Sequence, residues 1–316
     1  MPHDHAPADR SPQHSQSHGG HGGHGERQHG QSQHGQSHST RGHGGHGGHG
    51  DSHSGAGLPE LLDLDAELAR PQLDELTARA AALAGHPVRH IVDVGSGTGT
   101  GTFALLRRFP EAASTTVDSS DDMLARLTEA ARRHGVDTRI TPLRADLDAG
   151  WPTLEPADLI WASSSMHHMA EPDRVLRDIR ATLRPGGLFV MLEMEAMPWF
   201  LPPGFADGLE DRCQAAATEA RNEHLPHIGS DWPARLDAAG LTVLEARPLT
   251  VAIPAPLPAN ALLYAGTVLG RYRTTLADRL SPADRRALDD LLAPGALAAR
   301  SDLSVRSTRD VWITRS

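Results

Sequence analysis

Ile91-Val92-Asp93-Val94-Gly95-Ser96-Gly97-Thr98-Gly99-Thr100-Gly101 is the stretch around which the rest of the ordered chain is organised. It opens with β-branched residues, which are typical of a buried strand. Four glycines then alternate with small hydroxyl residues, and a helix-like apolar pattern begins at Phe103. We therefore expect a strand, a tight turn and a helix N-terminus, whose unpaired backbone N–H groups face whatever binds at the turn.

Two nucleotide-binding motifs can be compared with this turn. The dinucleotide fingerprint is G-x-G-x-x-G, and counting from Gly95 its last position is Thr100. Counting from Gly97, the last position is Thr102. The phosphate-binding P-loop needs a lysine, and the chain has none. Neither motif fits, and a glycine-rich turn without a ligand remains an alternative at this point.

The acidic residue two places before the first glycine offers a third comparison. The pattern Asp93-x-Gly95-x-Gly97-x-Gly99 resembles the first motif of the class I S-adenosylmethionine-dependent methyltransferases. The resemblance implies that this turn binds S-adenosylmethionine through Asp93, Gly95, Ser96, Gly97 and Gly99.

A second carboxylate follows at the end of the next expected strand, residues 114–118. Asp118 lies 25 residues after Asp93, where an acid can accept hydrogen bonds from both ribose hydroxyls of a nucleoside. An acid that only caps the following helix is the alternative. The run 118–124 is similar to the family's D-x-S-x-x-M-L, and this implies cofactor contacts from Asp118, Ser119 and Met123.

Three later landmarks complete the resemblance. After a strand expected at 138–143, Asp146 and Leu147 stand where the family binds adenine, and an ordinary loop acid is the alternative for Asp146. The strand 158–162 resembles the family's D-x-[IV] strand, which places Ala162 and Ser163 near the sulfonium. Leu183-Arg-Pro-Gly-Gly187 matches the family's turn before the fifth strand, expected at 188–193.

The order of these elements predicts the fold class. Alternating strands and helices form a parallel sheet with helices on both faces, and its ligands lie at the carboxyl ends of the strands. The resemblance implies a Rossmann-like, doubly wound α/β sheet of seven strands with the last one antiparallel. Residues 56–316 then form one domain, with a cofactor-binding core at 88–193 and substrate or cap elements at 58–84 and 194–300.

The flanking segments carry helix and strand signals. Residues 58–84 predict two helices broken near Pro71, and helices are expected at 210–224, 232–239, 259–269 and 282–292. Strands are expected at 241–245, 249–253, 303–305 and 310–314, and the apolar loop 197–204 is placed to close a substrate pocket.

Residues 1–55 differ from the rest of the chain. They hold 13 of the 20 histidines between Gly, Ser and Gln, with almost nothing apolar, which predicts a disordered tail. Imidazoles bind Ni²⁺, Zn²⁺ and Cu²⁺, so we expect weak divalent-metal binding in vitro. A solvated tail whose metal binding is adventitious is the favoured interpretation.

Composition narrows the function classes. The net charge of −10 argues against a nucleic-acid partner, and no apolar run is long enough to span a membrane. Cys213 is the single cysteine, which excludes an internal disulfide, and no signal peptide is recognised. We therefore expect a cytoplasmic protein.

The catalytic residues are less well defined. His167 and His168 are the best candidates for a general base, because imidazole titrates near neutrality; a turn that only shapes the pocket is the alternative. Glu193 could contact the acceptor or remain solvated, and Trp161 is better explained as core than as a stacking surface.

Three functions follow from these patterns. The first is S-adenosylmethionine-dependent methylation of a small-molecule acceptor, whose identity the sequence does not reveal. The second is an NAD-dependent oxidoreductase, which the missing third fingerprint glycine opposes. The third is a non-catalytic metal-binding or cofactor-sensing protein, suggested by the histidine-rich tail.

Overall fold

A computed structural model describes residues 57–194 and 196–316 of the chain. The predictions for the histidine-rich tail lie outside these residues. The described part contains a seven-stranded sheet with the order β3-β2-β1-β4-β5-β7-β6. Within this sheet β7 runs opposite to the other six strands, which are parallel to one another, as the predicted fold class requires. The strands are β1 (His90–Val94), β2 (Ala113–Asp118), β3 (Ile140–Arg144), β4 (Ala157–Ser163), β5 (Leu183–Glu193), β6 (Thr242–Ile253) and β7 (Val305–Arg315).

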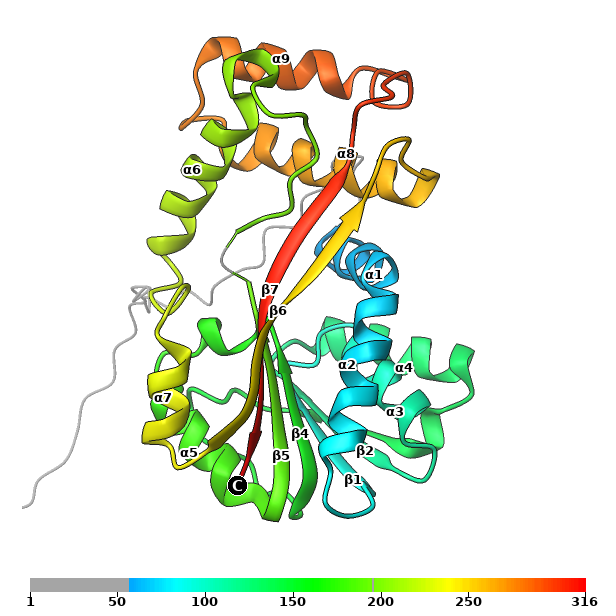
Figure 1. The fold of residues 1–316 in the computed structure, drawn as a ribbon, viewed down its shortest axis with the longest axis vertical. Helices are drawn as coiled ribbons and strands as arrows, with labels where there is room; N and C mark the ends of the chain where they lie inside the picture. The colour runs from blue at the N-terminus through cyan, green and yellow to red at the C-terminus, as the bar shows by residue number, and fades with distance from the viewer. Residues whose placement is uncertain (1–56, 195) are drawn as a thin grey trace, which may run out of the picture. The chain divides into compact units, whose positions relative to one another are not determined.

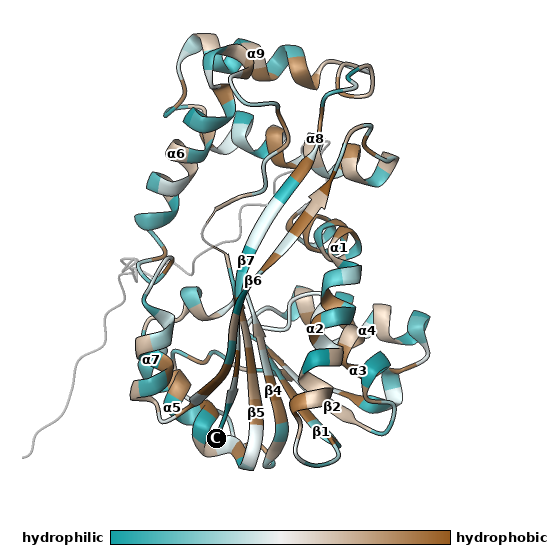
Figure 2. Ribbon diagram, viewed as in Figure 1, coloured by the Kyte–Doolittle hydropathy of each residue, from teal (hydrophilic) through white to brown (hydrophobic). Residues whose placement is uncertain are grey.

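Helices cover both faces of the sheet (Figure 1). One face packs against α2 (Arg70–Leu83), α3 (Thr100–Arg108) and α4 (Asp121–His134), and the other against α5 (Pro172–Thr182) and α7 (Trp232–Ala238). The central strands between them are predominantly apolar (Figure 2), because their side chains are buried on both faces. None of the described helices is long and apolar enough to cross a membrane.

A second apolar core lies beyond the carboxyl edge of the sheet. It is formed by α1 (Leu58–Leu68), α6 (Leu209–Asn222), α8 (Ala259–Thr275) and α9 (Pro282–Leu292), together with the loop residues Phe200 and Leu201. The long strands β6 and β7 run from the sheet to this core (Figure 1). The core therefore holds α1 above the glycine turn of β1.

Local sequence signals explain why most elements begin and end where they do. The hydroxyl of Ser120 accepts a hydrogen bond from the N–H of Met123 and begins α4, and Gly135 ends it in a left-handed conformation. The expected break between the first two helices falls at Ala69, and Pro71 lies in the first turn of α2, where it removes no hydrogen bond.

Two boundary predictions were wrong in an informative way. The strands expected at 241–245 and 249–253 form one strand, β6, because it pairs with β7 along its whole length. Pro248 lies within β6 opposite Asp310, and β6 is the edge strand, where proline is tolerated. The segments 303–305 and 310–314 likewise belong to the single strand β7 rather than to two strands.

Candidate functional site

Many of the predicted cofactor residues meet at the carboxyl edge of the sheet. A cavity of about 100 Å³ lies between the glycine turn, helices α1 and α2 and the ends of β4 and β5. Of the predicted set, its lining includes Asp93, Gly95, Ser96, Gly97 and Ser163. Ligand pockets usually measure roughly 300–1,000 Å³, so this cavity has room for one end of a ligand only.

The glycines of the turn have different roles. Gly97 has a φ of +51°, and a Cβ built there would meet nothing closer than Leu62 Cδ1 of α1, at 3.6 Å. This glycine therefore leaves open space on the cavity side. Gly99, in contrast, is required by packing, because its Cβ would lie 2.7 Å from Leu127 Cγ. Its φ of +87° also favours glycine at this position of the motif.

Two buried polar atoms on residues lining the cavity have no partner among the described residues. They are the hydroxyl oxygen of Ser96 and the indole nitrogen Nε1 of Trp161. Buried polar groups are normally hydrogen-bonded, so these atoms suit the polar groups of a ligand. Trp161 is fully buried, as core packing predicted, yet it also lines this cavity, which sequence reasoning did not anticipate.

The remaining predicted residues lie outside this cavity. Asp118 accepts hydrogen bonds from the N–H groups of Gly97 (2.8 Å) and Ser120 (2.9 Å), and so fixes both the glycine turn and the start of α4. Of its neighbours along the chain, Ser119 is exposed and Met123 is half-buried. Asp146 is exposed just after β3, whereas Leu147 and Ala162 are buried in the core beside α5.

Asp93 is the most deeply buried acid of the turn. It accepts a hydrogen bond from the hydroxyl of Thr102 at 2.5 Å. Burial raises the pKa of Asp93 to about 7, and the nearby charge of Asp118 adds to the rise, while the bond from Thr102 opposes it. Because burial makes the ionised form of Asp93 unfavourable, a positively charged ligand group beside it would stabilise that form.

This raised pKa predicts a pH-dependent stability. The folded protein keeps a proton on Asp93 that the unfolded chain releases above about pH 4, so the free energy of unfolding falls as the pH rises from about 4 to about 7. We expect Asp93→Asn, whose amide oxygen still accepts from Thr102, to unfold at a higher urea concentration than the wild type at pH 8. Its free energy of unfolding should then exceed that of the wild type by about 4 kcal/mol at most. The difference should vanish near pH 4.

Urea unfolding at several pH values checks this prediction. The exposed Asp122 on α4 provides the control, since Asp122→Asn should show no such pH-dependent gap. A constant difference between Asp93→Asn and the wild type from pH 4 to pH 8 would contradict the raised pKa.

The two candidate bases lie in a short turn after β4 and differ in their surroundings. Glu193, at the end of β5, is buried and accepts from the N–H of Met166 at 2.9 Å and from Nδ1 of His167. An ionised carboxylate only accepts, so Nδ1 of His167 carries the proton and Nε2 is left as a base. Glu193 is thus not solvated, and it orients His167.

The ring of His168 packs against that of His167. Its ring centroid lies 4.4 Å from that of His167, and its side chain is more exposed. Burial and the neighbouring His167 lower the pKa of His168, against the opposing charges of Glu193 and Asp118, so the neutral ring is favoured at pH 7. The structure therefore brings both predicted histidines and Glu193 into one cluster.

Hydrogen bonds that sequence reasoning missed hold helix α1 against the glycine turn and the second core. Asp63 accepts a hydrogen bond from the hydroxyl of Thr98 at 2.7 Å. Asp65 accepts from Tyr264 of α8 at 2.6 Å and from the buried guanidinium of Arg309 on β7. No local pattern signals these contacts, because the three segments are far apart in the chain.

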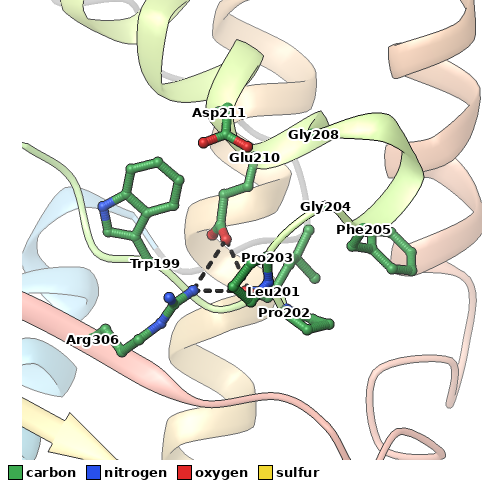
Figure 3. Close-up of a pocket in the computed structure, with 10 residues that line it drawn as sticks. All are labelled: Trp199, Leu201, Pro202, Pro203, Gly204, Phe205, Gly208, Glu210, Asp211 and Arg306. Atoms are coloured by element: carbon green, nitrogen blue, oxygen red, sulfur yellow. Dashed lines mark hydrogen bonds and ion pairs between the residues drawn. The ribbon is translucent and has the colours of Figure 1, made fainter.

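The loop expected to close a substrate pocket packs into the second core. Phe200 and Leu201 are buried, and their N–H groups donate to the carboxylate of Glu210 at 2.7 and 2.8 Å. A cavity of about 290 Å³ lies beside this loop, where Trp199 and Arg306 line its wall (Figure 3). Burial raises the pKa of Glu210, although the two N–H groups oppose the rise.

Metal ligands do not gather in the described part of the chain. Within residues 57–194 and 196–316, no three His, Cys, Asp or Glu side chains are arranged to hold a metal ion. The metal binding predicted for the histidine-rich tail concerns residues outside this range.

Comparisons with known proteins agree with the motif order. Residues 92–189 match the family described as a methyltransferase domain. The trans-aconitate 2-methyltransferase of Acidovorax ebreus (strain TPSY) is 36% identical over 128 residues, which are 40% of this chain and 45% of that protein. The methyltransferase GfsG of Streptomyces halstedii is 29% identical over 188 residues, 59% of this chain and 64% of that protein. The matched region thus spans about half to two thirds of these relatives.

Solved structures include similar folds at low identity. The cyclase SpnF is 22% identical with a TM-score of 0.46, and the alignment covers 77% of this chain and 80% of that one. Phosphoethanolamine N-methyltransferase 2 of Haemonchus contortus, in complex with S-adenosyl-L-methionine, is 14% identical with a TM-score of 0.44. That alignment covers 76% of this chain and 52% of the other.

Proposed function

The chain belongs to the class I S-adenosylmethionine-dependent methyltransferases, and from this premise we propose that it transfers a methyl group to a small-molecule acceptor. The observation that carries the proposal is the convergence of the glycine turn, Asp118 and the His167–Glu193 pair at one edge of the sheet. The relatives named for their substrates act on small molecules, and the net charge of −10 disfavours nucleic acid.

The residues at this edge fit the cofactor. Ser96 and Trp161 offer unpartnered polar atoms, and Gly97 leaves open space on the cavity side. Asp118 at the end of β2 would accept from the ribose, and Asp146 after β3 would accept from the adenine amino group. Ser119, Met123, Leu147, Ala162 and Ser163 complete the proposed cofactor set. The cofactor supplies a methyl group already activated for in-line displacement.

The chain's own contribution is placement and proton removal. The end of β4 and the histidine turn would hold the acceptor near the methyl group, which supplies the proximity that such a displacement needs. Nε2 of His167 would take the acceptor's proton, because Glu193 keeps the proton of the neutral ring on Nδ1. His168 is the second candidate for this role.

We also propose that the protein is located in the cytoplasm.

Calorimetric titration of the full chain in EDTA tests the proposal, with S-adenosylmethionine, S-adenosylhomocysteine and NAD in parallel. Micromolar binding of the two sulfur compounds without NAD binding is the expected result. Binding of NAD alone would overturn the proposal in favour of an oxidoreductase. Binding of none of the three, with tight Zn²⁺ binding when EDTA is left out, would favour a metal-binding protein.

A further inference from the structure

The cavity beside the glycine turn is lined by a buried positive charge. Among its described lining residues, Asp65 and Asp93 are acidic and Arg309 is the one cation. Arg309 lies on β7 and is 6% exposed. Burying a guanidinium costs free energy unless its charge and its N–H donors have partners, so the partners of Arg309 have to be accounted for.

The known partner of Arg309 uses only part of its hydrogen-bonding capacity. Its Nη2 donates to Asp65 Oδ2, and this is the one hydrogen bond that the structure shows for this guanidinium among the described residues. A guanidinium carries five N–H donors in a fixed plane, which suits a carboxylate with two oxygens. Arg309 can therefore receive a second carboxylate at the cavity.

The order of strands indicates which end of the cofactor reaches this cavity. In the proposed function, adenine lies by Asp146 after β3 and the ribose by Asp118 after β2. Neither residue lines the cavity, which lies further along the sheet, at the ends of β1, β4 and β5. The part of the cofactor beyond the ribose is the amino acid, with one ammonium and one carboxylate group.

We propose that Arg309 binds the α-carboxylate of the cofactor's amino-acid moiety, while the acid Asp93 faces its ammonium group. The proposal rests on the proposed function. It also gives Asp65 a role, because this carboxylate of α1 occupies the same guanidinium and must share it with the ligand. Cofactor binding is thereby coupled to the contacts that fasten α1 over the site.

Calorimetry with two matched compounds tests the assignment on the full chain. S-adenosylhomocysteine carries the carboxylate, and S-adenosyl-3-thiopropylamine lacks only that group. We expect Arg309→Gln to weaken binding of the first by about tenfold or more and to leave binding of the second unchanged. Arg309→Lys should give an intermediate affinity, and Arg133→Gln, at an exposed position on α4, should have no effect.

The comparison of the two compounds within one variant separates recognition from misfolding. The double variant Asp65→Asn/Arg309→Gln leaves no unpaired acid on α1, and it should show the same selective loss. Equal weakening of both compounds, or of neither, would overturn the assignment of Arg309. If the wild type binds neither compound, the proposed function itself fails, and that result is distinct from the loss of selectivity.

Discussion

Replacing Asp118 with alanine should weaken binding of S-adenosylhomocysteine by about 100-fold. The carboxylate accepts hydrogen bonds from the N–H groups of Gly97 and Ser120, so it holds the turn and the start of α4 in place. In the proposed function it also accepts from the ribose. Hydrogen bonds to a charged group contribute roughly 1.5–3 kcal/mol each, and each 1.4 kcal/mol is tenfold in affinity.

Calorimetry measures the affinity of each variant, and thermal unfolding checks that each variant is folded. Asp118→Asn keeps one acceptor oxygen and should lose less affinity than Asp118→Ala. Asp122→Ala, four residues further on at an exposed position of α4, is the matched control and should bind like the wild type. Unchanged affinity in a folded Asp118→Ala protein would show that this acid caps the helix and does not bind the cofactor.

The parts of the fold that were predictable from sequence are those with local causes. The β-branched run before Gly95 marks a buried strand, and the alternating glycines mark a tight turn, in which Gly95, Gly97 and Gly99 all have a positive φ. The helix expected at 282–292 likewise begins where it was predicted, because the Ser281 cap and the first-turn Pro282 of α9 act within one helical turn.

The parts that were not predictable depend on contacts between distant segments. Asp65 contacts Tyr264 and Arg309, which follow it by 199 and 244 residues, so no pattern on α1 reveals them. The role of Glu193 was left open for the same reason. Its burial follows from the pairing of β5 with β4 and β7, and only this pairing places its carboxylate against His167.

Glu193 is the position where a single atom exchange should separate binding from chemistry. In Glu193→Gln, the amide oxygen can still accept from the N–H of Met166, but the amide nitrogen then donates to Nδ1 of His167. The ring must move its proton to Nε2, the atom that would accept the acceptor's proton. We expect kcat to fall about 100- to 1,000-fold, as for loss of a general base.

The tautomer can be observed before any acceptor is known. Long-range ¹⁵N correlation spectra of the wild type should show neutral His167 protonated on Nδ1, and those of Glu193→Gln should show it protonated on Nε2. Affinity for S-adenosylhomocysteine should be the same in both proteins and in the control Glu111→Gln, whose side chain is exposed.

The pH profile decides between a base and a structural pair. If His167 is the base, kcat/KM of the wild type rises with pH, because the neutral imidazole is the active form. Glu193→Gln should lose this rising limb together with its rate, since Nε2 then holds a proton at every pH where the ring is neutral. A variant that keeps the limb and the rate would show that the pair only supports the turn, and His168 would remain the candidate base.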